Sequence, residues 1–268
     1  MSRLRPALVI LAAAGAAASL ACAHALREPR PLSGAPPEAG GASAAELIAE
    51  AEASFARRPD VAAVRRAESL FVAAAAADPR RIDGLVGAVH AKAWLIEHAP
   101  DADRGALAAS AIDAAQFCER RAPDTPPCDY ALAIALGLQA RERHATVLEG
   151  LKLMVQKLRH AAEGDPRLDR AGPQRVLALV FSRAPAWPLG LGDPESGVAA
   201  ARAAVALFPD YPPNQLALAE ALIAHDEPDQ GRAAARRAVL LAKDLAEAGD
   251  PDARDWVKAG EALLARVS

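Results

Sequence analysis

The side chains that could carry chemistry are few in this sequence and lie far apart along it. Metal-binding histidines usually occur in short motifs such as H-E-x-x-H, because ligands one helical turn apart face the same ion. No histidine here forms such a motif, and the sequence has no G-x-S-x-G turn and no phosphate-binding glycine loop. We therefore predict no enzyme, no metal and no cofactor, with six solvated or core histidines: His24, His90, His98, His144, His160 and His225. An active site assembled from distant residues is the least favoured alternative.

The first 22 residues predict export and a lipid anchor. Two arginines precede an apolar run of 15 residues, Ala7 to Ala21. This is shorter than the ~20 residues of a membrane-spanning helix and typical of a signal peptide, here residues 1–21. The run ends in Ala21-Cys22, which resembles a bacterial lipobox and makes Cys22 the predicted lipidation site. Simple cleavage after Ala25 is the alternative, because Ala23-His24-Ala25 fits the A-x-A rule.

The predicted anchor fixes the expected location. A bacterial lipoprotein carries more than one acyl chain, so anchoring would be effectively permanent, and Ala23 after the cysteine favours the outer membrane. Loss of Arg3 and Arg5 leaves 29 basic against 34 acidic residues, a net charge of −5. Nucleic-acid binding requires a basic surface. We predict a lipid-anchored periplasmic protein that binds no nucleic acid.

A short linker and a long helical domain follow. Residues 22–42 hold Cys22 and a stretch rich in Pro and Gly, which we interpret as a flexible tether. Residues 43–268 are rich in Ala, Leu, Arg and Glu, which favour helices, and lack the alternating Val, Ile and Thr of strands. Ser43 and Glu46 have the spacing of a capping box at a helix start. The predicted fold class is all-α.

An internal repeat organises this domain. Small or apolar residues recur at spacings of four, three and then five to a proline, and the prolines lie 44, 43 and 43 residues apart. Spacings of four and three place side chains on one helical face, and a proline cannot continue the helix. The four units are Ala67-Phe71-Ala74-Pro79, Ala111-Ala115-Cys118-Pro123, Met154-Leu158-Ala161-Pro166 and Gly197-Ala201-Ala204-Pro209; Gly231, Ala235 and Ala238 begin a fifth, with Lys243 at the proline position.

Each unit is predicted to be a helix hairpin. One hairpin leaves an apolar face uncovered, and stacking of neighbours buries it. We expect an α-solenoid of about five hairpins with a C-terminal capping helix that begins near Asp250-Pro251. The predicted pairs are about 44–58 with 60–77, 81–98 with 102–121, 127–143 with 145–163, 171–183 with 194–208, and 212–225 with 228–246, followed by a helix at 251–267.

Two family resemblances rest on these residues. The small–x3–large–x2–small–x4–Pro pattern resembles the tetratricopeptide repeat, with Ala67 to Pro79 as the closest copy, although the period of about 43 exceeds that family's 34. Residues 171–243 resemble the T-component family that accompanies TRAP transporters, which are periplasmic lipoproteins of degenerate tetratricopeptide-like units. The most specific element is the Pro-rich loop Ala184-Pro185-Ala186-Trp187-Pro188-Leu189-Gly190-Leu191-Gly192-Asp193.

The second resemblance implies a non-catalytic binding scaffold, an accessory component of a TRAP-type solute uptake system. A periplasmic solute-binding protein is the partner class it implies, and homo-oligomerisation stays open. The alternative function is a carrier or sensor of a small apolar solute held inside the helical stack.

Candidate contact residues lie in the Pro-rich loop: Trp187, Leu189, Leu191 and Asp193. Trp187 is interpreted either as a plug over the solenoid edge or as a contact at the mouth of a groove. Trp94 and Trp256 lie on predicted helices and are interpreted as core residues.

Cys118 and Cys128 are candidate disulfide partners. Cys118 takes the last small position of the second unit, and Cys128 begins the next hairpin. In an exported chain a disulfide between consecutive units is favoured. The alternative is two buried, reduced thiols.

Overall fold

The computed structural model of the chain describes residues 25–32, 41–100, 102–142, 147–186 and 188–267. Apart from one isolated bridge between Ala186 and Gly192, these residues form only helices and irregular segments. None of the described helices is long and apolar enough to cross a membrane. The helices are α1 (Ala44–Phe55), α2 (Val61–Ala77), α3 (Asp83–His98), α4 (Arg104–Arg121), α5 (Pro126–Glu142), α6 (Val147–Gly164), α7 (Gly172–Arg183), α8 (Pro194–Leu207), α9 (Pro212–Ala224), α10 (Pro228–Glu247) and α11 (Ala253–Arg266).

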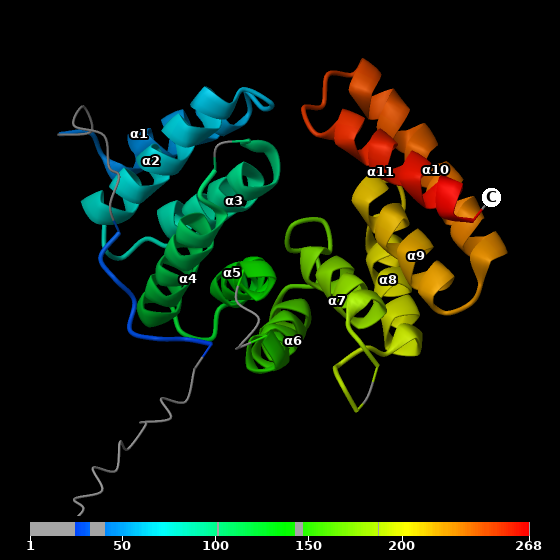
Figure 1. The fold of residues 1–268 in the computed structure, drawn as a ribbon. Helices are drawn as coiled ribbons and strands as arrows, with labels where there is room; N and C mark the ends of the chain where they lie inside the picture. Colours follow the sequence, from blue (N-terminus) through cyan, green and yellow to red (C-terminus); the bar gives the residue numbers. More distant parts are fainter. Residues whose placement is uncertain (1–24, 33–40, 101, 143–146, 187, 268) are drawn as a thin grey trace, which may run out of the picture.

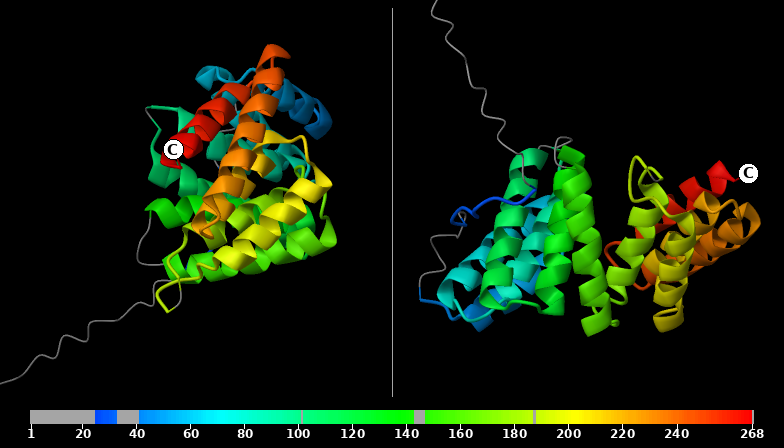
Figure 2. Two further views of the ribbon diagram at one scale, coloured as in Figure 1. Left: turned by 90° about the vertical axis from the view of Figure 1, so that its right-hand side faces the viewer. Right: turned by 90° about the horizontal axis from the view of Figure 1, so that it is seen from below.

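The helices form five hairpins that stack into a curved solenoid, as predicted (Figure 1). The pairs are α1 with α2, α3 with α4, α5 with α6, α7 with α8, and α9 with α10, and α11 packs on α10. Each helix packs mainly on its neighbours in sequence, so every hairpin covers the face that the previous one leaves open. The curvature turns the α1–α2 end of the stack toward the α10–α11 end, as the views of Figures 1 and 2 show.

The repeat seen in the sequence forms the packing surface within this stack. Every small or apolar position of the five units is buried, including Ala67, Cys118, Leu158, Ala204 and Ala238, none of which is more than 1% exposed. Each closing proline lies two residues after the second helix of its hairpin: Pro79 after α2, Pro123 after α4, Pro166 after α6 and Pro209 after α8. In the fifth hairpin, where Lys243 replaces the proline, α10 continues to Glu247.

A glycine in the fourth unit shows why small residues are needed at these positions. A β-carbon on Gly197 would lie 2.7 Å from Ser182 Oγ and 3.3 Å from the Ala178 carbonyl oxygen of α7. Contacts this short require a neighbour to shift. The approach of α8 to α7 therefore depends on the missing side chain.

The predicted capping box begins α1. Ser43 Oγ accepts a hydrogen bond from Glu46 N at 3.3 Å, and Glu46 Oε2 accepts one from Ser43 N at 2.8 Å. The exchange satisfies two backbone donors that would otherwise lack partners at the helix start.

Part of the predicted tether is packed on the domain, which corrects the interpretation of residues 22–42 as flexible throughout. Residues 25–32 have no regular secondary structure, but they lie along α4. Ala25 is 3% exposed and its N–H donates to Glu149 of α6 at 3.2 Å. Further along, Gln116 donates to the Arg27 carbonyl at 2.8 Å, and Asp113 accepts from Arg30 N at 3.2 Å. The Pro-rich composition predicted the irregular backbone but not these side-chain anchors.

Candidate binding cavity

The two ends of the solenoid meet through an ion pair. Arg58 follows α1, and Asp252 lies directly before α11, 194 residues later in the chain. The Arg58 guanidinium donates from Nε and Nη2 to the two carboxylate oxygens of Asp252, each at 2.9 Å. It also lies 3.9 Å from the centre of the Phe55 ring. Because a bidentate pair fixes both groups in orientation, this contact holds the α1–α2 turn against the α10–α11 turn.

A second, more exposed contact joins the same ends. His98 Nε2 lies 3.3 Å from an Asp255 carboxylate oxygen, and His98 Nδ1 lies 2.9 Å from the Trp94 carbonyl oxygen. The Trp94 and His98 rings are stacked with centres 4.3 Å apart. Since the side chains of His98 and Asp255 are 32% and 46% exposed, their ion pair contributes little to stability.

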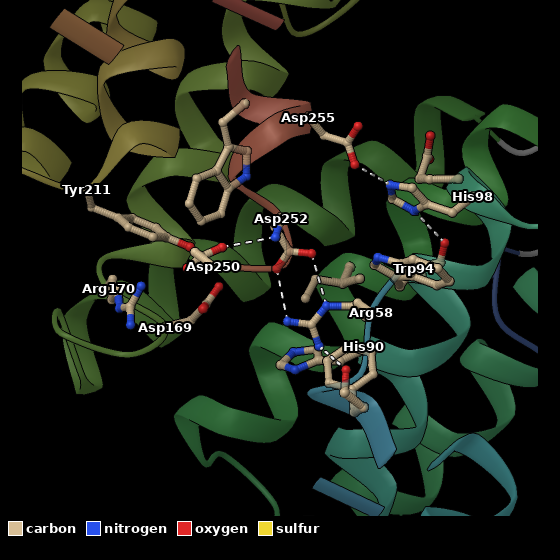
Figure 3. Close-up of a pocket in the computed structure, with 15 residues that line it drawn as sticks. Arg58, His90, Trp94, His98, Asp169, Arg170, Tyr211, Asp250, Asp252 and Asp255 are labelled. Carbon is tan, nitrogen blue, oxygen red and sulfur yellow. Dashed lines mark hydrogen bonds and ion pairs between the residues drawn. The ribbon is translucent and has the colours of Figure 1, made fainter. Parts of the chain in front are cut away.

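Beside these contacts lies an open cavity of about 820 Å³, lined from both ends of the chain (Figure 3). Its size falls in the range of known ligand pockets. One side comes from α3, another from α11 and the turn before it, and a third from the segment before α7. The aromatic lining residues are Phe55, Trp94, Tyr211 and Trp256, and the acidic ones are Glu97, Asp169, Asp250, Asp252 and Asp255.

A strained segment presents Asp169 and Arg170 to the cavity. Asp169, Arg170 and Ala171 have φ values of 47°, 52° and 64°, in a left-handed region that is costly for L-residues. Tyr130 donates from its hydroxyl to Asp169 Oδ2 at 2.7 Å, and Arg175 Nη2 donates to the same oxygen at 2.7 Å. Burial, followed by the Asp169 charge, raises the pKa of Tyr130. The phenol therefore stays protonated and keeps its role as a donor.

His90 brings an unpartnered polar atom to the cavity wall. Its Nε2 is enclosed and makes no hydrogen bond to any described residue. Burial lowers the pKa of His90, and the opposing effect of Asp169 is smaller, so the imidazole is neutral at pH 7. A buried ring nitrogen without a partner is costly and rare. The wall of the cavity therefore encloses a polar atom that the chain itself does not satisfy.

The Pro-rich loop selected from the sequence lies apart from this cavity. None of its described residues is among the lining residues. Leu189 is 82% exposed, and Leu191 packs against the core cluster that extends from α2 to α7. Asp193 caps α8, accepting from Ser196 N at 3.1 Å and from Ser196 Oγ at 2.6 Å, and these bonds lower the pKa of Asp193. Trp187 and Cys22 lie outside the described residues.

Two tryptophans correct another sequence-based interpretation. Trp94 and Trp256 were expected in the core, but both are half-buried and line the cavity. The available signal was the spacing of His90, Trp94 and His98, which repeats every four residues and places three ring-bearing side chains on one face of α3. Arg58 and Asp252 gave no such signal, because nothing in the local sequence relates positions so far apart.

The structure joins Cys118 and Cys128 in a disulfide away from the cavity. The bond links the end of α4 to the start of α5, that is, the second hairpin to the third. Both residues are fully buried.

A second charged cluster lies beside this disulfide, between α4, α5 and α6. Lys157 Nζ lies 2.7 Å from Glu119 Oε2 and 2.6 Å from Asp129 Oδ1. His160 Nδ1 pairs with the other Asp129 oxygen. Asp129 is fully buried, whereas the His160 side chain is 47% exposed. We call Glu119, Asp129, Lys157 and His160 the Asp129 cluster.

The groups of the Asp129 cluster change one another's pKa values. Burial opposes ionisation of Asp129, but hydrogen bonds from Lys157, His160 and Glu119 outweigh it and hold its pKa below the usual value. Burial raises the pKa of Glu119. The hydrogen bond to Asp129 raises the pKa of His160. No group of three or more metal-ligating side chains is placed to hold an ion, here or elsewhere in the described part of the chain.

Comparison with known proteins defines the class of the fold. The chain is similar to TTC0263, a thermophilic TPR protein of Thermus thermophilus, with a TM-score of 0.61, 20% identity, and coverage of 81% of this chain and 98% of that one. The MamA protein gives a TM-score of 0.46 at 12% identity, covering 76% of this chain and 94% of that one. No protein-family model and no curated protein matches the sequence. The molecule is a tetratricopeptide-like α-solenoid, and the predicted fold class is confirmed.

Proposed function

We propose that the chain is a non-catalytic scaffold that binds a protein partner in the cavity between α3 and α11. The observation that carries this proposal is the cavity itself, in which aromatic and charged groups from both ends of the chain converge beside the Arg58–Asp252 contact. Solenoids of this class form concave surfaces that suit partner binding.

Site-specific photocrosslinking tests the location of binding. A benzoylphenylalanine replaces Trp94 in the cavity, and the matched control replaces Leu240, which is 58% exposed on α10 and does not line the cavity. We expect one discrete adduct in cells from the Trp94 position and none from Leu240. Adducts of equal yield from both positions, or none from either, contradict binding in the cavity.

The export and anchoring of the protein are part of the proposal. The lipobox-like Ala21-Cys22 supports lipidation of Cys22, and the packing of Ala25 adds support, because cleavage after Ala25 would remove a buried residue and its hydrogen bond to Glu149. The intact mass of the mature protein decides the point. A mass that begins at an acylated Cys22 is expected, and one that begins at Leu26 contradicts it.

The likeness of residues 171–243 to TRAP T-components supports a narrower role, as an accessory lipoprotein of a TRAP-type uptake system whose partner is the periplasmic solute-binding protein. Genes for the large and small membrane subunits next to this one would support that assignment. Recovery of an unrelated protein in the Trp94 adduct would contradict it.

A second candidate function is the carriage of a small solute, which the size of the cavity favours. Native mass spectrometry of protein purified from its own cells tests this alternative. A bound mass that is lost when Trp94 or Trp256 is changed to alanine supports it, and ligand-free protein contradicts it.

A further inference from the structure

The cavity has more acidic than basic groups on its walls. Five carboxylates line it against two guanidinium groups, those of Arg58 and Arg170. Arg58 is already engaged with Asp252. Arg170 lies 4.8 Å from the centre of the Tyr211 ring. Which of the five carboxylates already have a cation therefore decides what a ligand can pair with.

One of the carboxylates has no cation of its own. Asp169 pairs with Arg175, and Glu97 pairs with Arg141. Asp250 accepts a backbone hydrogen bond from Asp252 N at 2.9 Å, but no Lys, Arg or His among the described residues lies within ion-pair distance. A half-buried carboxylate in this state can accept a charge-assisted hydrogen bond from outside the chain.

The aromatic walls also have contact positions that the chain itself does not use. Cations are attracted to ring faces, and tryptophan is the strongest acceptor. Arg58 already lies over Phe55, and Arg170 and Arg175 lie over Tyr211. His98 stacks on one face of Trp94, and Tyr211 meets Trp256 in an edge-to-face contact with the ring centres 5.5 Å apart. Among the described residues, however, no guanidinium or ammonium group lies over either indole. The indole surface that faces the cavity can thus take a cation supplied by a ligand.

His90 adds an unpaired polar atom to this wall. The residue is partly buried, and its enclosed Nε2 has no partner among the described residues. As a neutral imidazole it adds no positive charge to the wall.

We propose that the cavity recognises an arginine side chain on an exposed segment of the protein partner, with Asp250 as the ion-pair acceptor and Trp94 and Trp256 as the aromatic contacts. Arginine fits better than lysine, because its planar guanidinium can stack on an aromatic ring while its N–H groups donate to a carboxylate. This inference rests on the proposed function and adds the chemistry of the partner to it.

Calorimetric titration of the purified protein tests the inference. The probe is a short, end-capped peptide of alternating glycine and arginine, and the matched peptide carries citrulline, which keeps the shape of arginine without its charge. We expect the citrulline peptide to bind at least about tenfold more weakly, as for the loss of one charge-assisted contact. Equal binding of the two peptides overturns the inference.

Two matched variants place the effect at the proposed acceptor. Asp250→Asn removes the charge, and its remaining carbonyl oxygen can still accept from Asp252 N. Asp244→Asn makes the same charge change on the exposed surface of α10. We expect about tenfold weaker binding of the arginine peptide to Asp250→Asn and an unchanged affinity for Asp244→Asn. Equal affinity for both variants, whether or not it is lower than that of the unchanged protein, overturns the assignment.

The outcomes separate this inference from the proposed function. A Trp94-dependent adduct together with no preference for arginine removes only the inference. Loss of both the adduct and the peptide binding removes both.

Discussion

The cavity and the Asp129 cluster are both rich in charge, but they differ in how completely the charges are paired. In the cluster, Lys157 bridges Glu119 and Asp129, and His160 takes the other Asp129 oxygen. Glu119 Oε1 in the cluster and His90 Nε2 in the cavity each lack a hydrogen-bond partner, so the contrast lies in the ion pairs. In the cavity, within the described part of the chain, Asp250 has no cation, and no guanidinium or ammonium group lies over Trp94 or Trp256.

This difference in ion pairing is our reason for assigning a structural role to the cluster and for proposing the cavity as a binding site. The ion pairs of the cluster link α4, α5 and α6 to one another. Groups left without partners can contribute to the affinity for a ligand. Four predictions test this distinction, beginning with the largest expected effect.

Replacement of Asp129 by asparagine should be the most damaging single change in the two regions. It removes a fully buried charge and leaves Lys157, itself only 17% exposed, with one partner fewer. Breaking a buried pair in this way costs about 3–5 kcal/mol. Urea denaturation of Asp129→Asn, read beside Asp250→Asn in the cavity, measures the contrast. Equal stability of the two variants would show that the cluster is not the structural brace described here.

The disulfide beside the Asp129 cluster should contribute less to the free energy of unfolding than the buried Asp129 charge does. Cys118 and Cys128 are ten residues apart in sequence, and closing so short a loop stabilises by about 2–3 kcal/mol. The double variant Cys118→Ala with Cys128→Ala should lose that amount in thermal or urea unfolding. Alkylation of the denatured, unreduced protein should find neither thiol free, and two free thiols in this pair would rule the bond out.

The ion pair that joins the two ends of the solenoid should have a smaller interaction energy than the disulfide. Arg58 and Asp252 form a bidentate pair whose side chains are 13% and 31% exposed, so we expect a coupling of about 1 kcal/mol. A double-mutant cycle with Arg58→Met and Asp252→Asn measures it. Strict additivity of the two changes would mean that the two turns do not hold each other in solution.

The smallest expected effect is a difference in pKa between His160, in the Asp129 cluster, and His90, at the cavity wall. His160 has a raised pKa, so its contribution to stability is complete below about pH 6.5 and is lost as the pH rises through its folded value. His90 has a lowered pKa, so its contribution is complete above about pH 6.5 and is lost as the pH falls toward its folded value. NMR titration of the ring protons should give His160 a pKa above about 6.5 and His90 a pKa below it. The reverse order would contradict the contrast between the two regions.

The sequence predicted the helical stack well because its signals are local. Proline closes each unit two residues after a helix, and small residues four and three apart share the buried face. In both cases a short window of sequence contains the physical cause. The capping box at Ser43 is predictable for the same reason.

The cavity could not be predicted in this way. It depends on the curvature of the whole stack, which brings Arg58 to Asp252 across 194 residues. Trp94 looks like a core residue in the sequence, because an indole on a helix is usually buried. It lines the cavity only because α11 lies opposite α3 in the folded chain. Residues 25–32 illustrate the same limit, because their anchors on α4 and α6 lie 83 residues or more away.

The most direct test of this account follows the indole N–H resonances of Trp94 and Trp256 during titration with the glycine–arginine peptide. These residues lie toward opposite ends of the chain but on one cavity. We predict that both resonances shift with the same concentration dependence, while the His160 ring in the Asp129 cluster does not respond. A peptide that binds but shifts only one indole, or neither, would contradict a single binding cavity formed by the two ends of the solenoid.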